Sequence, residues 1–143
     1  MDPVLANRRM TLRKLTKGES ATAVVKAADY WNPTGIEVGY LEAYAVEAEG
    51  EWDDWGRRSD ADGQSGTFLQ ELFQGAKRCG QAQWFQLVGS VGATDERLVP
   101  LGTFARWTSR SLEPGELFLF ANDAPGFYWN NSGELTVRIT RIG

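Results

Sequence analysis

The sequence predicts an all-β protein, a jelly-roll-like antiparallel β-sandwich with one short helix. Three observations support this prediction: several short segments alternate between apolar and polar residues, turn residues separate them, and one segment has helical spacing. A chain of 143 residues makes one domain of ordinary size. We expect residues 21–143 to form a single β-sandwich domain, and residues 1–20 to be an N-terminal extension that is either flexible or an edge strand.

The clearest strand pattern lies near the C-terminus, where Leu135, Val137 and Ile139 alternate with polar residues. This alternation is typical of a strand with one buried face. Residues 40–49 show a similar alternation that is imperfect because Glu42 falls in the apolar phase. Further strands are predicted over residues 22–27, 84–91, 98–107 and 117–121. The last of these is continuously apolar, so we expect it to be buried on both faces.

Turn and helix signals divide these strands. Residues 31–35, WNPTG, predict a turn because proline restricts φ and glycine permits positive φ. Apolar residues from Phe68 to Ala76 recur at helical spacing. Thr67 with Gln70 three residues later predicts the start of a two- to three-turn helix, and Gly80 predicts its end.

Composition excludes several kinds of function. The formal net charge is −4, whereas nucleic-acid-binding domains are usually basic. The chain has no histidine, which excludes Ser-His-Asp catalysis and histidine-containing zinc sites, and one cysteine, Cys79, which excludes an internal disulfide. It has no apolar run long enough to span a membrane. Residues 1–20 do not resemble a signal peptide, so we expect a protein that stays in the cytoplasm or is exported without a Sec signal.

Residues 122–133, NDAPGFYWNNSG, carry the strongest local signal. If the strands on either side pair, the ends of this loop are close, and Asp123 converges with Asn130 and Asn131. One carboxylate with two amide carbonyls is an all-oxygen set that suits calcium. The same residue types are also common in plain turns, so the composition is compatible with either. Of the three aromatic residues in the loop, we expect at least one to fold back onto the core.

The stretch GELFLFANDAPGFYWNNSGELTVRI, residues 115–139, resembles the C-terminal region of the PA-I-type galactophilic lectins. A weaker likeness extends over residues 22–114. That family is calcium-dependent and has a small jelly-roll β-sandwich in which sugar hydroxyls complete the shell of the ion. The resemblance therefore implies a non-catalytic, calcium-dependent lectin that binds galactosides or related glycans. It also implies a homo-oligomer.

The resemblance implies roles for particular residues. Asp123, Asn130 and Asn131 would bind calcium through side-chain oxygens, and Trp55 and Phe127 through backbone carbonyls. The sugar-binding residues it implies are Asp123, Asn130, Gln64 and Trp129. Gln64 takes the place of a glutamine that grips the sugar in family galactose binders, whereas their neighbouring histidine has no counterpart here. Trp129 replaces a small residue.

Two alternatives remain at this point. In the first, the calcium loop is only structural and the module binds protein or lipid instead of sugar. In the second, the chain is a glycoside-processing enzyme that uses a carboxylate pair such as Asp53 and Asp62.

Overall fold

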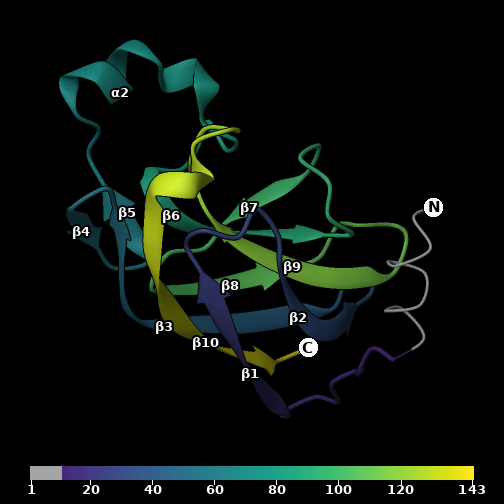
Figure 1. Ribbon diagram of the computed structural model, residues 1–143. Coiled ribbons are helices and arrows are strands. Elements are labelled where there is room, and N and C mark those ends of the chain that lie inside the picture. The colour runs from purple at the N-terminus through teal and green to yellow at the C-terminus, as the bar shows by residue number, and fades with distance from the viewer. Residues whose placement is uncertain (1–10) are drawn as a thin grey trace.

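The computed structural model describes residues 11–143 and confirms the predicted β-sandwich (Figure 1). The first five-stranded sheet has the order β1 (Ser20–Lys26), β10 (Asn131–Arg141), β3 (Ala43–Asp54) and β4 (Arg57–Ser59), and β8 (Phe104–Thr108) also pairs with β3. The second has the order β2 (Asn32–Val38), β9 (Gly115–Ala121), β6 (Trp84–Val91) and β5 (Asp62–Gln64), and β7 (Leu98–Pro100) also pairs with β6. The strand pairs in both sheets are antiparallel.

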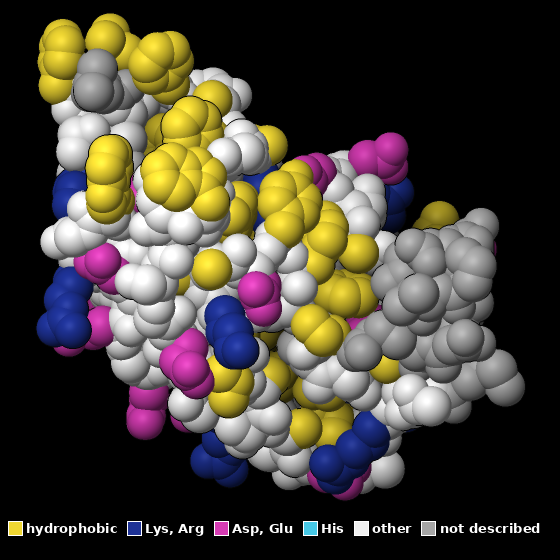
Figure 2. Space-filling model, in the orientation of Figure 1, with side chains coloured by type: hydrophobic (Ala, Val, Ile, Leu, Met, Phe, Trp, Pro, Cys, Tyr) yellow, Lys and Arg dark blue, Asp and Glu magenta, His cyan; other side chains and the backbone are white. Residues whose placement is uncertain are grey.

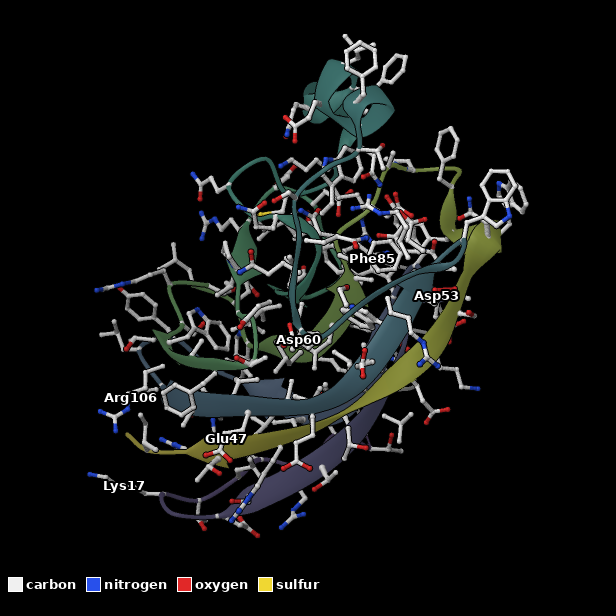
Figure 3. The ribbon with its side chains drawn as sticks, turned by 90° about the vertical axis from the view of Figure 1, so that its left-hand side faces the viewer. Lys17, Glu47, Asp53, Asp60, Phe85 and Arg106 are labelled. Carbon is white, nitrogen blue, oxygen red and sulfur yellow. The ribbon has the colours of Figure 1, made fainter. Side chains whose placement is uncertain are left out.

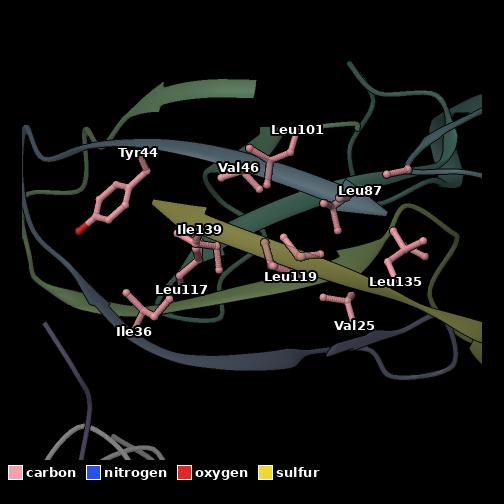
Figure 4. Close-up of a cluster of buried hydrophobic side chains, with 14 of the residues drawn as sticks. Val25, Ile36, Tyr44, Val46, Leu87, Leu101, Leu117, Leu119, Leu135 and Ile139 are labelled. Atoms are coloured by element: carbon pink, nitrogen blue, oxygen red, sulfur yellow. The ribbon is translucent and has the colours of Figure 1, made fainter. Parts of the chain in front are cut away.

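The core lies between the two sheets and follows the predicted alternation (Figure 4). Leu135, Val137 and Ile139 on β10 are fully buried, and the intervening Thr136 and Arg138 are exposed. Strand β9 is buried on both faces, as predicted. Its inner face contributes to the main core, while its outer face packs in a second cluster beneath Trp31.

The prediction of one strand over residues 98–107 was wrong. This segment forms β7 in one sheet and β8 in the other. Gly102 lies between them at φ 77°, a conformation that side chains disfavour, and this allows the chain to leave one sheet for the other.

The predicted turn at residues 31–35 was also wrong, because most of this segment belongs to β2. Asn32 organises the preceding turn from within the strand: its side chain accepts a hydrogen bond from Lys26 N at 2.8 Å and donates to Lys26 O at 3.0 Å. The proline and glycine mark an irregularity in the strand, where the pairing of β2 with β9 shifts between Pro33 and Glu37.

The helix begins as predicted but is shorter. Thr67 and Gln70 form a reciprocal capping box at the start of α2 (Phe68–Leu72). A short 3-10 helix, η1 (Gln74–Ala76), follows, and neither helix reaches Gly80. Figure 1 shows α2 standing beyond one end of the sandwich. The side chains of Phe68 and Leu72 do not enter the core, since they are 79% and 63% exposed.

The N-terminal part of the chain contributes to the core. Leu15 is fully buried among the core side chains, and Arg13 forms a single parallel bridge with Ile36. Residues 1–10 of the predicted extension lie outside the described residues. No helix within residues 11–143 is long and apolar enough to cross a membrane.

Candidate functional site

Residues 122–130 connect β9 in one sheet to β10 in the other, at the end of the sandwich that carries α2 (Figure 1). Strands β9 and β10 do not pair, so the arrangement from which we predicted convergence of the loop ends is wrong. The buried Asn122 fixes the start of the loop instead. Its side chain accepts a hydrogen bond from Cys79 N at 2.9 Å and donates to Cys79 O at 2.9 Å and to Gln83 O at 3.0 Å.

The predicted convergence of Asp123 with Asn131 is nevertheless present. Asp123 is buried and accepts hydrogen bonds from Ala124 N at 2.8 Å and from Asn131 Nδ2 at 3.1 Å. Burial, together with the nearby charge of Asp54, raises the pKa of Asp123 to about 6, against the effect of these two hydrogen bonds. A buried carboxylate that is costly to ionise is well placed to face a cation.

Two amide oxygens in this loop are buried without a partner. Within residues 11–143, no hydrogen bond reaches Asn130 Oδ1 or Asn131 Oδ1. The orientation of the Asn131 amide follows from its nitrogen, which donates to Ala27 O at 3.1 Å as well as to Asp123. Leaving a buried acceptor unpaired costs about 1–3 kcal/mol, so these two oxygens are candidate ligands for a cation.

Backbone geometry explains how two consecutive asparagines can serve one site. Asn130 ends the 3-10 turn η2 (Tyr128–Asn130), and Asn131 is the first residue of β10. In a regular strand the two side chains would point to opposite faces. The change from turn to strand between them removes that restriction.

Asp54 is a second carboxylate at the site that the sequence analysis missed. It is the cross-strand partner of Asn131 at the end of β3, and it lines the same cavity as Asp123. Burial raises the pKa of Asp54, and Gln70 Nε2 donates to its Oδ2 at 2.9 Å. Its position directly before Trp55 is the signal that could have identified it.

Asp54, Asp123 and Asn130 line a cavity of about 500 Å³. Its lining combines a polar part with an apolar rim, and its residues are Asp54, Trp55, Arg57, Thr67, Gln70, Phe73, Ala76, Trp84, Asp123, Ala124, Phe127 and Asn130. Figure 2 shows the yellow apolar side chains gathered at the α2 end of the molecule. The cavity thus brings together two carboxylates, an amide and exposed aromatic rings.

The structure places both predicted carbonyl ligands on the rim of the cavity. Trp55 has a positive φ of 46°, and its N–H donates to Asn130 O at 3.2 Å. The side chains of Trp55 and Phe127 are 77% and 55% exposed. Of the loop's three aromatic residues, only Tyr128 folds back and is buried, as we expected for at least one of them.

The remaining predicted sugar-binding residues lie beside the cavity. Trp129 is exposed, and its ring centroid is 6.2 Å from that of Trp55. Gln64 does not line the cavity but is the cross-strand partner of Trp84, which does.

Arg78 contacts the loop formed by residues 122–130, and the sequence analysis did not identify it. Its backbone N–H donates to Asp123 O at 3.1 Å, and its fully buried guanidinium donates to Tyr128 Oη at 2.9 Å. The guanidinium lies 3.6 Å from the ring centroid of Tyr30 and 3.5 Å from that of Phe120. These contacts hold the loop to the second sheet.

The carboxylates considered for an enzyme have structural partners. Asp53 accepts a hydrogen bond from Gly56 N at 2.9 Å, and Asp62 accepts one from Thr103 N at 2.7 Å. Figure 3 shows Asp53 nearer to α2 than Glu47, which lies on the same strand β3. In the described part of the chain, no group of three or more Asp, Glu, Cys or His side chains could hold a metal, so an ion here depends on amide and carbonyl oxygens as well.

The comparisons with known proteins point to the same kind of fold. No family model matches the sequence, and no curated protein does. Among solved structures, the chain is similar to the N-terminal domain of EclA, described as a PllA-like lectin, with 20% identity and a TM-score of 0.63. The similarity covers 85% of this chain and 95% of that one. The chain has the fold of this lectin domain.

Proposed function

We propose that this protein is a calcium-dependent, non-catalytic carbohydrate-binding module whose site is the cavity at Asp123. One observation carries the proposal: Asn130 Oδ1 and Asn131 Oδ1 are buried without partners among residues 11–143, beside a buried carboxylate. The fold shared with a lectin domain supports the same function.

The donor set fits calcium. Asp123, Asn130 and Asn131 would hold the ion through side-chain oxygens, and the carbonyls of Trp55 and Phe127 would add backbone ligands. Asp54 lies close enough to Asp123 to raise the pKa of its carboxyl group, and it adds negative charge to the site. Bound calcium would supply a divalent positive charge, and sugar hydroxyl oxygens would complete its coordination shell.

The protein's own side chains would orient the sugar. The Asp123 and Asn130 oxygens that face the cavity would accept hydrogen bonds from sugar hydroxyls. Trp55 and Phe127 present exposed rings on the rim, and Trp129 lies next to Trp55; aromatic faces suit the C–H side of a sugar ring. On the resemblance of residues 115–139 to galactophilic lectins, we propose a galactoside as the ligand.

Thermal unfolding of metal-stripped protein tests this proposal. We expect calcium to raise the melting temperature and methyl galactoside to raise it again only when calcium is present, because a ligand bound to the folded state alone stabilises it. Asp123→Ala should abolish the calcium response. Phe127→Leu should keep it, since only the carbonyl of that residue would bind the ion. No calcium shift in the stripped protein, or loss of the shift in Phe127→Leu, would contradict the ligand assignment.

A second candidate function rests on the exposed apolar side chains around α2. Phe68, Leu72 and Phe73 are each more than 60% exposed, which is unusual for a group of neighbouring residues. They favour a module that keeps calcium for structure and binds protein or lipid. A calcium shift with no response to any glycan on an array, together with calcium-dependent binding to phosphatidylcholine vesicles, would support this candidate. The homo-oligomer stays a prediction.

A further inference from the structure

Trp52 and Trp84 are buried near the site, and they differ in the hydrogen bonding of the indole N–H. Trp52 Nε1 donates to Phe85 O at 3.0 Å. Trp84 is only 3% exposed and lines the cavity, yet its Nε1 has no hydrogen-bond partner in the described chain. A buried N–H without an acceptor costs free energy, and in a cavity wall it marks a position where a ligand acceptor would be stabilised.

A second buried donor in the same state lies beside it. Gln64 is the cross-strand partner of Trp84 in the pairing of β5 with β6, and opposed side chains in such a pair are about 5 Å apart. Gln64 Nε2 is also buried without a partner within residues 11–143. The face of the sheet that carries Trp84 therefore presents a second donor without an acceptor among residues 11–143.

The backbone around Trp84 is arranged in an unusual way. Phe85 has a φ of 63°, a left-handed conformation that is costly for an aromatic residue. The N–H of Phe85 donates to Asn122 O at 2.8 Å, directly before Asp123. Trp84 is therefore held on a segment attached to the proposed calcium loop.

Gly66 packs closely against the indole N–H of Trp84. A Cβ atom at this position would lie 2.9 Å from Trp84 Nε1 and 2.8 Å from Glu71 Oε1. Gly66 does not have a positive φ, so the turn itself does not require glycine. Glycine at this position therefore allows the chain to pack directly against the unpartnered N–H.

We propose that the Trp84 indole N–H donates a hydrogen bond to an acceptor oxygen of the bound saccharide. This inference rests on the proposed function. It assigns a donor to the part of the wall that Trp84 forms on β6, while Asp54 and Asp123 supply acceptors. The ligand class is accordingly a saccharide that offers hydroxyl donors to the carboxylates and a ring or hydroxyl oxygen to Trp84.

Trp84→Phe tests the assignment, with Trp52→Phe as the matched control. Both variants remove an indole from the same region, but only Trp52 loses a hydrogen bond made within the fold. Isothermal titration with calcium and then with the best-binding glycan of an array should show a roughly five- to tenfold loss of glycan affinity in Trp84→Phe, the effect of about one hydrogen bond. Calcium affinity should not change. Trp52→Phe should keep the glycan affinity and lose thermal stability.

A second variant and an NMR measurement guard against a packing effect in Trp84→Phe. Gly66→Ala should displace the indole N–H, because its Cβ would lie 2.9 Å from Trp84 Nε1, and should weaken glycan binding without changing calcium affinity. In the wild-type protein, the Trp84 indole N–H resonance should shift when glycan is added to the calcium-loaded form. Unchanged glycan affinity in Trp84→Phe, or an unmoved indole resonance, would overturn this inference alone. A wild-type protein that binds calcium but no glycan would overturn the proposed function as well.

Discussion

The side chain of Asn131 donates a hydrogen bond to Asp123 at 3.1 Å, although the two residues adjoin strands of different sheets. Asn131 opens β10, and Asp123 follows β9 by two residues. The connection between the two sheets therefore brings the carboxylate and the amide together. We had expected pairing of β9 with β10 to do this. Asp54 joins them because β3 lies next to β10 in the first sheet.

Asp54→Asn should weaken calcium binding about tenfold, because it removes a negative charge beside the proposed ligands while keeping a similar shape. Titration calorimetry with calcium on metal-stripped protein measures this effect. Asp53→Asn is the matched control, since Asp53 is the neighbouring acid and accepts a hydrogen bond from Gly56 N. Equal losses in the two variants would show that general charge, and not the position of Asp54, determines the affinity.

Arg78→Lys should lower the free energy of unfolding by about 1–3 kcal/mol. Lysine keeps the positive charge but loses the planar group that lies against Tyr30 and Phe120 and donates to Tyr128. Chemical denaturation compares this variant with Arg58→Lys, whose side chain is exposed on β4. An Arg78→Lys variant as stable as wild type would mean that the ring contacts contribute little.

Glu42→Gln should destabilise the protein at pH 7 by about 1–2 kcal/mol, the worth of hydrogen bonds to a charged group. Burial alone raises the pKa of Glu42, but hydrogen bonds from Gly39 N, Lys14 and Tyr44 outweigh it and hold the pKa below 4.5. Because the folded pKa is lowered, the stabilisation is complete above pH 4.5 and is lost as the pH falls through the folded value. Denaturation at several pH values should show the difference between variant and wild type shrinking in acid. A constant difference would argue against ionised Glu42 as its source.

Phe68→Ser should change the free energy of unfolding by less than about 0.5 kcal/mol, because the side chain is 79% exposed. Phe120→Ala should cost about 3–5 kcal/mol, since Phe120 is fully buried. Thermal or chemical denaturation of the pair measures the contrast. A large loss in Phe68→Ser would indicate that α2 packs against something in solution, such as a second copy of the chain.

Local patterns predicted much of the fold. The alternation of Leu135, Val137 and Ile139 and the apolar run of β9 identified strands with one and two buried faces, because burial acts on each strand separately. The capping box at Thr67 was also local. The apolar spacing that follows Thr67 predicted a longer helix than the one observed. It also did not predict that Phe68 and Leu72 of the helix are exposed, since helical periodicity does not tell whether a neighbouring surface covers the helix.

By itself, the sequence determined the all-β class, the start of the helix, and the loop that holds Asp123, Asn130 and Asn131, because each depends on residues close together in the chain. Only the tertiary structure decided that residues 98–107 divide between two sheets. It also decided which residues from distant parts of the chain lie near the loop. These are Asp54 from β3, Arg78 from the segment before β6, and Trp84, whose N–H has no hydrogen-bond partner among the described residues. Their positions depend on contacts between strands far apart in sequence, which no local pattern records.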